Sequence, residues 1–276
     1  MAKPKQPSKK RRALGIAAAG ILGVGTVGHF VLEDRAADAF NEYAAQSYTP
    51  SAECLNTIYS EAARQTISAA PEAYDILVVP GFTANDAYMS DLRSALESAG
   101  HSAHGWDGGV LWTDVEANAA QIEKRINEIY AANGGKRIAI VGYSLGGVYA
   151  REASRNNADK VSQVVTLSAP INLKQDNGEP DPRIQAIHDI YDQAEAHSYD
   201  APLTVPTTAI ASSSDLIVDW IAASIKENNE ISENLHAPSG HVMMPFSDGT
   251  ARLVLDRLAE PQDSWQPAAQ KYCRVR

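Results

Sequence analysis

The chain reads IAIVGYSLGG at residues 138–147, and this stretch joins two kinds of secondary structure. The apolar run at 137–141 predicts a strand buried on both faces, and residues 145–155 predict a helix. Between them, the pattern Gly-x-Ser-x-Gly centred on Ser144 is typical of a strand–turn–helix so tight that only glycine fits two residues on either side of the serine. We expect this turn to lift the Ser144 hydroxyl clear of the sheet, as a nucleophile.

The alternation of strands and helices extends outward from this turn in both directions. Short apolar runs bounded by turn residues predict strands, and apolar residues at helical spacing predict helices. Buried strands that alternate with helices form a parallel sheet covered on both faces, and ligands bind at the carboxyl ends of such strands. The further strands are expected at 75–79, 101–106, 161–167 and 204–211, and the further helices at 86–99, 115–132 and 250–258.

Two backbone amides are candidates for an oxyanion hole beside the serine. The amide of Leu145 begins the predicted helix and would point to the developing negative charge. A second donor should come from the loop after the strand at 75–79, where Gly81 lets the backbone approach and the Phe82 amide is the candidate. An ordinary tight turn at Phe82 is the alternative. A phosphate-binding turn is the alternative for the serine motif, although the lysine of a P-loop is missing.

The serine needs a base, and the base needs an acid to orient it. In this architecture the acid and then the histidine follow the serine along the chain. His241, in a Gly/Ser turn before the last predicted helix, is the candidate base, with His236 at the end of the last strand as the alternative. Asp215, just after the strand at 204–211, is the candidate acid. Asp219 is its competitor, although an aspartate near a strand end can simply cap a turn.

The N-terminus has the layout of an export signal. The first twelve residues carry six Lys or Arg side chains and no acid, and residues 13–32 carry no formal charge. Twenty helical residues span about 30 Å, the thickness of the bilayer's hydrocarbon core. We therefore expect residues 1–35 to be a signal anchor that exports the body and holds it at the membrane, or a signal peptide whose cleavage would leave a secreted protein.

Charge and cysteine content exclude several classes of protein. Removing the six N-terminal positive charges from the net charge of −10 leaves −16 on residues 13–276, a poor surface for nucleic acid. Two cysteines are too few for a disulfide-built scaffold and lack zinc-ligand spacing. Export would allow Cys54 and Cys273 to pair, and two free thiols are the alternative. No motif indicates a metal or a redox cofactor, so we expect no cofactor.

The body divides into two expected parts after the N-terminal segment, and the second contains an insertion. Residues 36–72 predict a helical spacer or a packed leading segment, and residues 73–276 form the main domain. Within it, residues 171–203 predict an insertion in which a helix covers the site as a lid, or packs on the sheet as a surface helix. The insertion is rich in acids, which an anionic lipid surface would repel. This favours a small ester or a neutral acyl substrate.

These motifs, in this order, resemble the α/β-hydrolase superfamily, in particular its bacterial lipase/esterase-like branch. The resemblance implies an α/β fold: a mostly parallel sheet with helices on both faces and a cap insertion. It implies Ser144, Asp215 and His241 as nucleophile, acid and base, and the Phe82 and Leu145 amides as the oxyanion hole. The segments that carry it are Val79-Pro80-Gly81-Phe82, Trp106-Asp107-Gly108-Gly109, 142–150, 164–170, 214–218 and Gly240-His241.

Two positions depart from that pattern. Pro80 stands where many lipases carry histidine, and Ser239-Gly240 stands before His241 where similar proteins often have Gly-Ser. The implied activity is that of a serine hydrolase that cleaves small-molecule or lipid esters through an acyl-enzyme. An acyltransferase on the same fold and a non-catalytic, membrane-tethered binding protein are the alternatives.

Overall fold

A computed structural model of the chain describes residues 52–64, 73–111, 115–172, 201–226, 230–261 and 264–273. The N-terminal segment expected at 1–35 lies outside the described residues, as does the greater part of the expected insertion, residues 173–200. Among the helices that are described, none combines the length and the apolar character needed to cross a bilayer.

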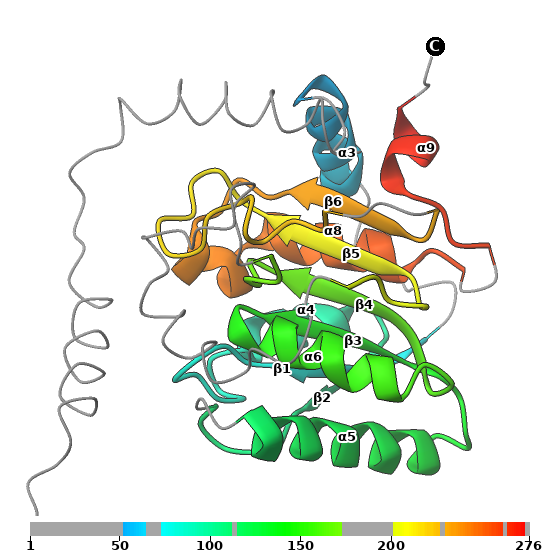
Figure 1. Cartoon of the computed structure of the whole chain (residues 1–276). Coiled ribbons are helices and arrows are strands. Elements are labelled where there is room, and N and C mark those ends of the chain that lie inside the picture. Colours follow the sequence, from blue (N-terminus) through cyan, green and yellow to red (C-terminus); the bar gives the residue numbers. More distant parts are fainter. Residues whose placement is uncertain are drawn as a thin grey trace, which may run out of the picture.

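Six parallel strands form one sheet, in the order β2-β1-β3-β4-β5-β6 (Figure 1). The apolar runs supply its centre, where every residue of β3, β4 and β5 is buried. The fold class predicted from the sequence is therefore confirmed. The strands are β1 (Asp75–Val79), β2 (Ser102–Gly105), β3 (Ile138–Tyr143), β4 (Val161–Leu167), β5 (Thr207–Ala211) and β6 (Ser232–His236).

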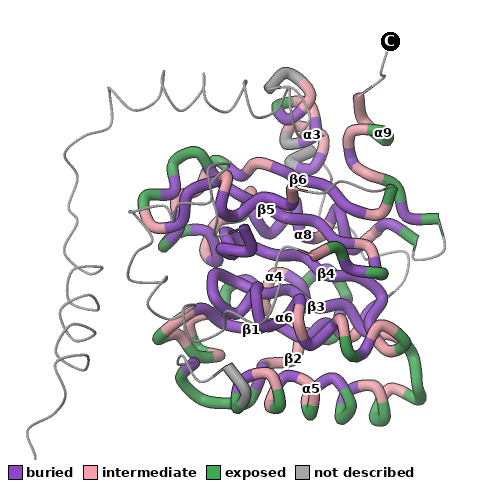
Figure 2. The backbone as a smooth tube through the Cα atoms, in the orientation of Figure 1, coloured by how far each residue is buried: buried purple, intermediate pink, exposed green. Residues whose placement is uncertain are grey.

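Helices cover both faces of the sheet because successive strand residues point to opposite sides. In β1, Leu77 and Val79 pack into the core under α5 and α6, whereas Ile76 and Val78 pack into the core under α3, α4 and α8. The buried residues form a continuous layer in the middle of the molecule (Figure 2). The helices are α3 (Ala52–Arg64), α4 (Ser90–Ser98), α5 (Val115–Ala132), α6 (Leu145–Asn156), α8 (Asp248–Leu258) and α9 (Ala268–Tyr272).

One predicted helix is shorter than expected. The helix predicted at 86–99 begins only at Ser90. The Asn85 side chain accepts hydrogen bonds from the amides of Ala87 and Tyr88, at 3.0 and 3.3 Å. Such an Asx turn competes with helical hydrogen bonding, so it delays the start of the helix.

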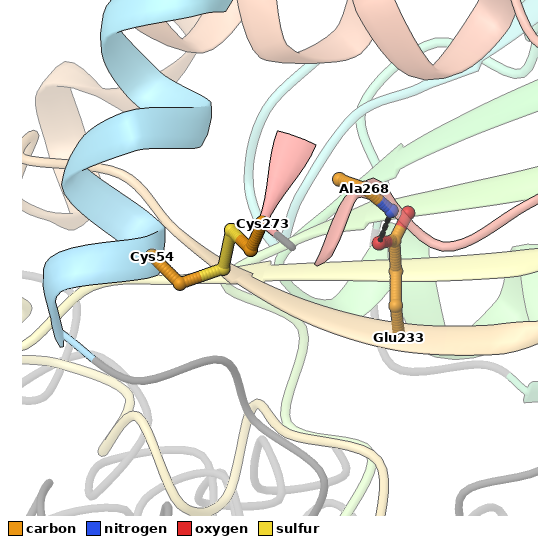
Figure 3. Close-up of a disulfide and its surroundings, with 4 residues drawn as sticks. All are labelled: Cys54, Glu233, Ala268 and Cys273. Carbon is orange, nitrogen blue, oxygen red and sulfur yellow. Dashed lines mark hydrogen bonds between the residues drawn. A yellow bond between two sulfur atoms is a disulfide. The ribbon is translucent and has the colours of Figure 1, made fainter. Parts of the chain in front are cut away.

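A disulfide joins the first described helix to the residue that follows the last one. Cys54 of α3 and Cys273, directly after α9, are paired with a Cα–Cα distance of 5.7 Å (Figure 3). The sequence left this pairing open. Leu55, Ile58 and Ala62 of α3 are buried in the main core, so this helix packs on the body of the molecule.

We expect the double variant Cys54→Ser, Cys273→Ser to lose about 2–5 kcal/mol of unfolding free energy. The bond closes a loop whose ends lie 219 residues apart, which restricts the unfolded chain. Urea titrations of the oxidised protein, the reduced protein and the double variant would measure this. The reduced protein is the control, because it should match the variant. Equal stability of all three would contradict the prediction.

Candidate active site

The serine motif forms the strained turn that its glycines indicate. β3 ends at Tyr143 and α6 begins at Leu145, so Ser144 alone makes the turn, with φ 52° and ψ −129°. A Cβ atom on Gly142 would lie 2.5 Å from the Cα of Gly147, and one on Gly146 would lie 2.0 Å from the carbonyl oxygen of Pro80. These contacts with backbone cannot relax, so glycine is required at both positions.

Ser144, His241 and Asp215 form one continuous chain of hydrogen bonds. The distance from Ser144 Oγ to His241 Nε2 is 3.0 Å, and that from His241 Nδ1 to Asp215 Oδ2 is 2.7 Å. A carboxylate only accepts, so the proton of this second bond lies on Nδ1, and Nε2 is left to accept the serine hydroxyl. All three residues are buried, at 6–7% exposure. The imidazole is therefore oriented as a base toward a shielded hydroxyl.

Asp215 is held by the backbone that follows it. Its Oδ1 accepts hydrogen bonds from the amides of Ile217 and Val218, at 2.8 and 2.9 Å. These two bonds fix one carboxylate oxygen and leave Oδ2 facing the imidazole. The short loop after β5 thus determines the orientation of the acid.

The alternative base and the alternative acid each form hydrogen bonds with other groups. His236 Nε2 accepts from the Ser213 amide at 2.8 Å and lies 2.9 Å from the Ser213 hydroxyl. Burial lowers the pKa of His236. Asp219 Oδ1 accepts from the Ile221 amide at 2.8 Å, as a turn-capping aspartate does. The structure brings His241 and Asp215 to Ser144, as the order along the chain suggested.

The loop proposed for the second oxyanion donor runs against the serine turn. A Cβ atom on Gly81 would lie 3.0 Å from the Cβ of Ser144, so Phe82 follows at the edge of the site. Hydrogen bonds of 2.8 Å from Thr83 to Leu111, and from Leu111 to Ala84, fix this loop. The Leu145 amide is the first of α6, where no preceding turn supplies an acceptor.

The turn that carries His241 differs from the sequence expectation. A Gly/Ser turn was expected there, but His241 begins a short 3₁₀ helix, η2 (His241–Phe246). Two tyrosines that the sequence did not single out donate hydrogen bonds to this segment: Tyr143 to the carbonyl of His241 at 3.0 Å, and Tyr88 to that of Val242 at 2.9 Å. Among the described residues, no group of three His, Cys, Asp or Glu side chains could hold a metal ion.

A parallel sheet of this kind, with a strained serine after β3 and an acid and a histidine after later strands, is the arrangement of the α/β-hydrolase fold, and the chain has that fold. Within it, residues 100–227 match the family model for the PGAP1-like alpha/beta domain. That match includes Ser144 and Asp215 and ends before His241. No curated protein matches the chain.

Solved structures share the fold at low sequence identity. A monoacylglycerol lipase of Paleococcus ferrophilus is 16% identical, with a TM-score of 0.50, over 67% of this chain and 93% of its own. Lipase B of Aspergillus fumigatus is 15% identical, with a TM-score of 0.56, over 73% of this chain and 56% of its own. An alpha/beta hydrolase enzyme from a lagoon-sediment metagenome of Mar Chica, Morocco, is 17% identical, with a TM-score of 0.50, over 67% of this chain and 90% of its own. These similarities show the fold.

Proposed function

We propose that this protein is a serine hydrolase that cleaves carboxylic esters through an acyl-enzyme intermediate. The observation that carries the proposal is the hydrogen-bonded triad of Ser144, His241 and Asp215. The distance from Ser144 Oγ to His241 Nε2 is 3.0 Å, and that from His241 Nδ1 to Asp215 Oδ2 is 2.7 Å. The fold it shares with proteins named as lipases gives further support.

The mechanism follows from the position of each group. His241 Nε2 takes the proton of Ser144 as the serine oxygen attacks the ester carbonyl, and the Leu145 and Phe82 amides stabilise the oxyanion. His241 then gives this proton to the leaving alcohol. Water, deprotonated by His241, then attacks the acyl-enzyme carbonyl; the bond to the Ser144 oxygen breaks, His241 returns the proton to that oxygen, and the acid is released. Asp215 holds the imidazole in the required tautomer and stabilises its charged form. Each oxyanion donor contributes about 3–4 kcal/mol.

Apolar side chains at the edge of the site favour a substrate with an apolar part. Leu216, next to Asp215, is 68% exposed, and Val242 and Met243, next to His241, are 46% and 59% exposed. Ser214 Oγ donates to the Pro238 carbonyl at 3.4 Å, so the two loops that carry these side chains are adjacent. An acyl chain lying across them would be removed from water.

We expect Met243→Ser to raise KM for an octanoate ester about threefold to fivefold and to leave KM for the acetate ester unchanged. The longer chain would lose apolar contact worth about 1 kcal/mol, whereas acetate does not reach so far. Steady-state kinetics with the two p-nitrophenyl esters would measure the effect, with Met243→Leu as the matched control. An equal rise in KM for both esters would contradict the placement of the acyl chain.

A series of p-nitrophenyl esters from acetate to dodecanoate tests the proposed activity, together with a fluorophosphonate label. We expect turnover of at least part of the series, and mass spectrometry should find the label on Ser144. Product analysis with added alcohols separates hydrolysis from acyl transfer. A folded protein that turns over no ester and takes no label would overturn the proposal and favour a binding protein.

We also propose that the protein is exported and held at the membrane by its N-terminal segment. The Cys54–Cys273 disulfide supports export, because such bonds persist mainly in oxidising compartments. Membrane fractionation of the full chain, followed by N-terminal sequencing, tests this. An intact N-terminus in the membrane fraction indicates an anchor, a shortened soluble form indicates a cleaved signal, and a cytoplasmic protein would overturn the proposal.

A further inference from the structure

Two tyrosine hydroxyls donate hydrogen bonds to consecutive backbone carbonyls of the segment that carries His241. Tyr143 donates to the His241 carbonyl at 3.0 Å, and Tyr88 donates to the Val242 carbonyl at 2.9 Å. The two side chains come from different places. Tyr143 is the last residue of β3, directly before Ser144, and Tyr88 lies in the turn that precedes α4. The segment is therefore tied to the sheet and to the neighbouring turn by two separate bonds.

The bond from Tyr88 replaces one that the backbone cannot make. In a 3₁₀ helix the carbonyl of residue i accepts from the amide of residue i+3. For Val242 that residue is Pro245, which lies inside η2 and has no N–H. The Tyr88 hydroxyl supplies a donor at this carbonyl. A side chain from another element thus stabilises the turn at the point where its own hydrogen bonding is interrupted.

Aromatic rings form a connected series between the two ends of η2. Phe246 meets Tyr88 edge to face with centroids 4.9 Å apart, and Tyr88 stacks on Tyr143 at 5.9 Å. Tyr143 in turn lies 5.1 Å from the ring of His241. The two hydroxyls are therefore presented by rings that are themselves packed, so their positions are well determined.

Tyr143 is suited to remain a donor. It is 4% exposed, and burial, followed by the influence of Tyr88 and Asp215, raises its pKa well above the usual value for tyrosine. Its hydroxyl consequently stays protonated at neutral pH. Because Tyr143 is bonded in sequence to Ser144, it links the backbone of the nucleophile directly to the backbone of the base.

From these contacts we infer that Tyr143 and Tyr88 are positioning residues, which hold the His241 segment so that Nε2 stays directed at the Ser144 hydroxyl. The inference rests on the proposed function. Neither hydroxyl is assigned a proton transfer. Their contribution is geometric, and displacing reacting groups by about 1 Å can cost on the order of 100-fold in rate.

The test compares Tyr143→Phe, Tyr88→Phe and the double variant with Tyr130→Phe, a control on α5, which packs on the other face of the sheet. Phenylalanine keeps each ring and removes only the hydroxyl. We expect kcat for the best ester to fall about tenfold in Tyr143→Phe and about threefold in Tyr88→Phe, with KM changed less than twofold. The double variant should lose more than the product of the two, because each hydroxyl partly holds the segment alone.

Two further measurements separate positioning from a general loss of structure. The apparent pKa in the pH profile of kcat/KM should move in both variants, and the downfield NMR resonance of the proton on His241 Nδ1 should shift or broaden. Circular dichroism should show an intact fold at the assay temperature. Unchanged kcat, pH profile and resonance in folded Tyr143→Phe and Tyr88→Phe would overturn the inference. If the wild type hydrolyses no ester, the proposed function fails, and the His241 resonance still decides whether the tyrosines position the ring.

Discussion

Replacing Ser144 with alanine should lower kcat/KM for the best ester about 10⁵-fold and leave the fold intact. The change removes only the oxygen that His241 Nε2 meets at 3.0 Å, so the oxyanion amides and the binding surface persist and give a small residual rate. The backbone strain at this position is the same for alanine as for serine, so we expect little change in thermal stability. Initial rates with purified protein, and melting followed by circular dichroism, would measure both effects.

Ser213→Ala is the matched control for this variant. Ser213 is also a serine in contact with a histidine, but its partner is His236. We expect this control to keep turnover within twofold of the wild type. Wild-type turnover in Ser144→Ala, or an equal loss in the two variants, would show that the chemistry lies elsewhere.

The variant Arg257→Met should lose about 3–5 kcal/mol of unfolding free energy. Arg257 is fully buried in α8 and is the shared cation of three acids: it lies 3.1 Å from Glu233 and 3.5 Å from Glu260, and it also bonds Asp256. Methionine fills similar space but leaves these carboxylates without their guanidinium. Burial already raises the pKa of Glu233, so its charge is costly even when paired. Urea titration would measure the loss.

Two further variants sharpen this experiment. Lys124→Met removes a cation 3.5 Å from Glu128 on the exposed side of α5, and it should leave the unfolding free energy unchanged within error. Adding Glu233→Gln to Arg257→Met should restore part of the loss, because a neutral amide tolerates burial better than an unpaired carboxylate. An Arg257→Met protein as stable as the wild type would contradict this account of the cluster.

Most of the sheet could be predicted because its strands are continuous apolar runs between helices. The edge strand β2, with the sequence Ser-Ala-His-Gly, lacks such a run, and so does the buried strand β6. Its sequence Ser232-Glu233-Asn234-Leu235-His236 is polar, yet the first four residues are buried. Glu233 accepts from Thr208 at 2.9 Å and from the Ala268 amide at 2.6 Å, the latter drawn in Figure 3. These partners come from distant parts of the chain, so a local pattern could indicate only Asn234-Leu235.

The residues of the candidate site, and their order along the chain, could be predicted from the sequence, but the distances between them could not. The glycines around Ser144 are a local steric signal, so the turn could be inferred from the sequence. Asp215 and His241 could be preferred to their competitors because of their place in the chain. The hydrogen-bond distances between the three residues, however, depend on how the loops after β5 and β6 pack. Tyr143 occupies a position in the motif where any residue is allowed, so nothing in the sequence indicated its bond to the His241 carbonyl.

The Cys54–Cys273 bond determines what happens to the molecule when its backbone is cut once. A protease that cuts once at any point between the two cysteines produces two fragments, yet both stay on one molecule. Such a nicked, two-chain form would keep every residue of the sheet and would migrate as a single band in electrophoresis until a reductant is added. In surroundings that contain proteases, this molecule can therefore survive one scission without losing either half.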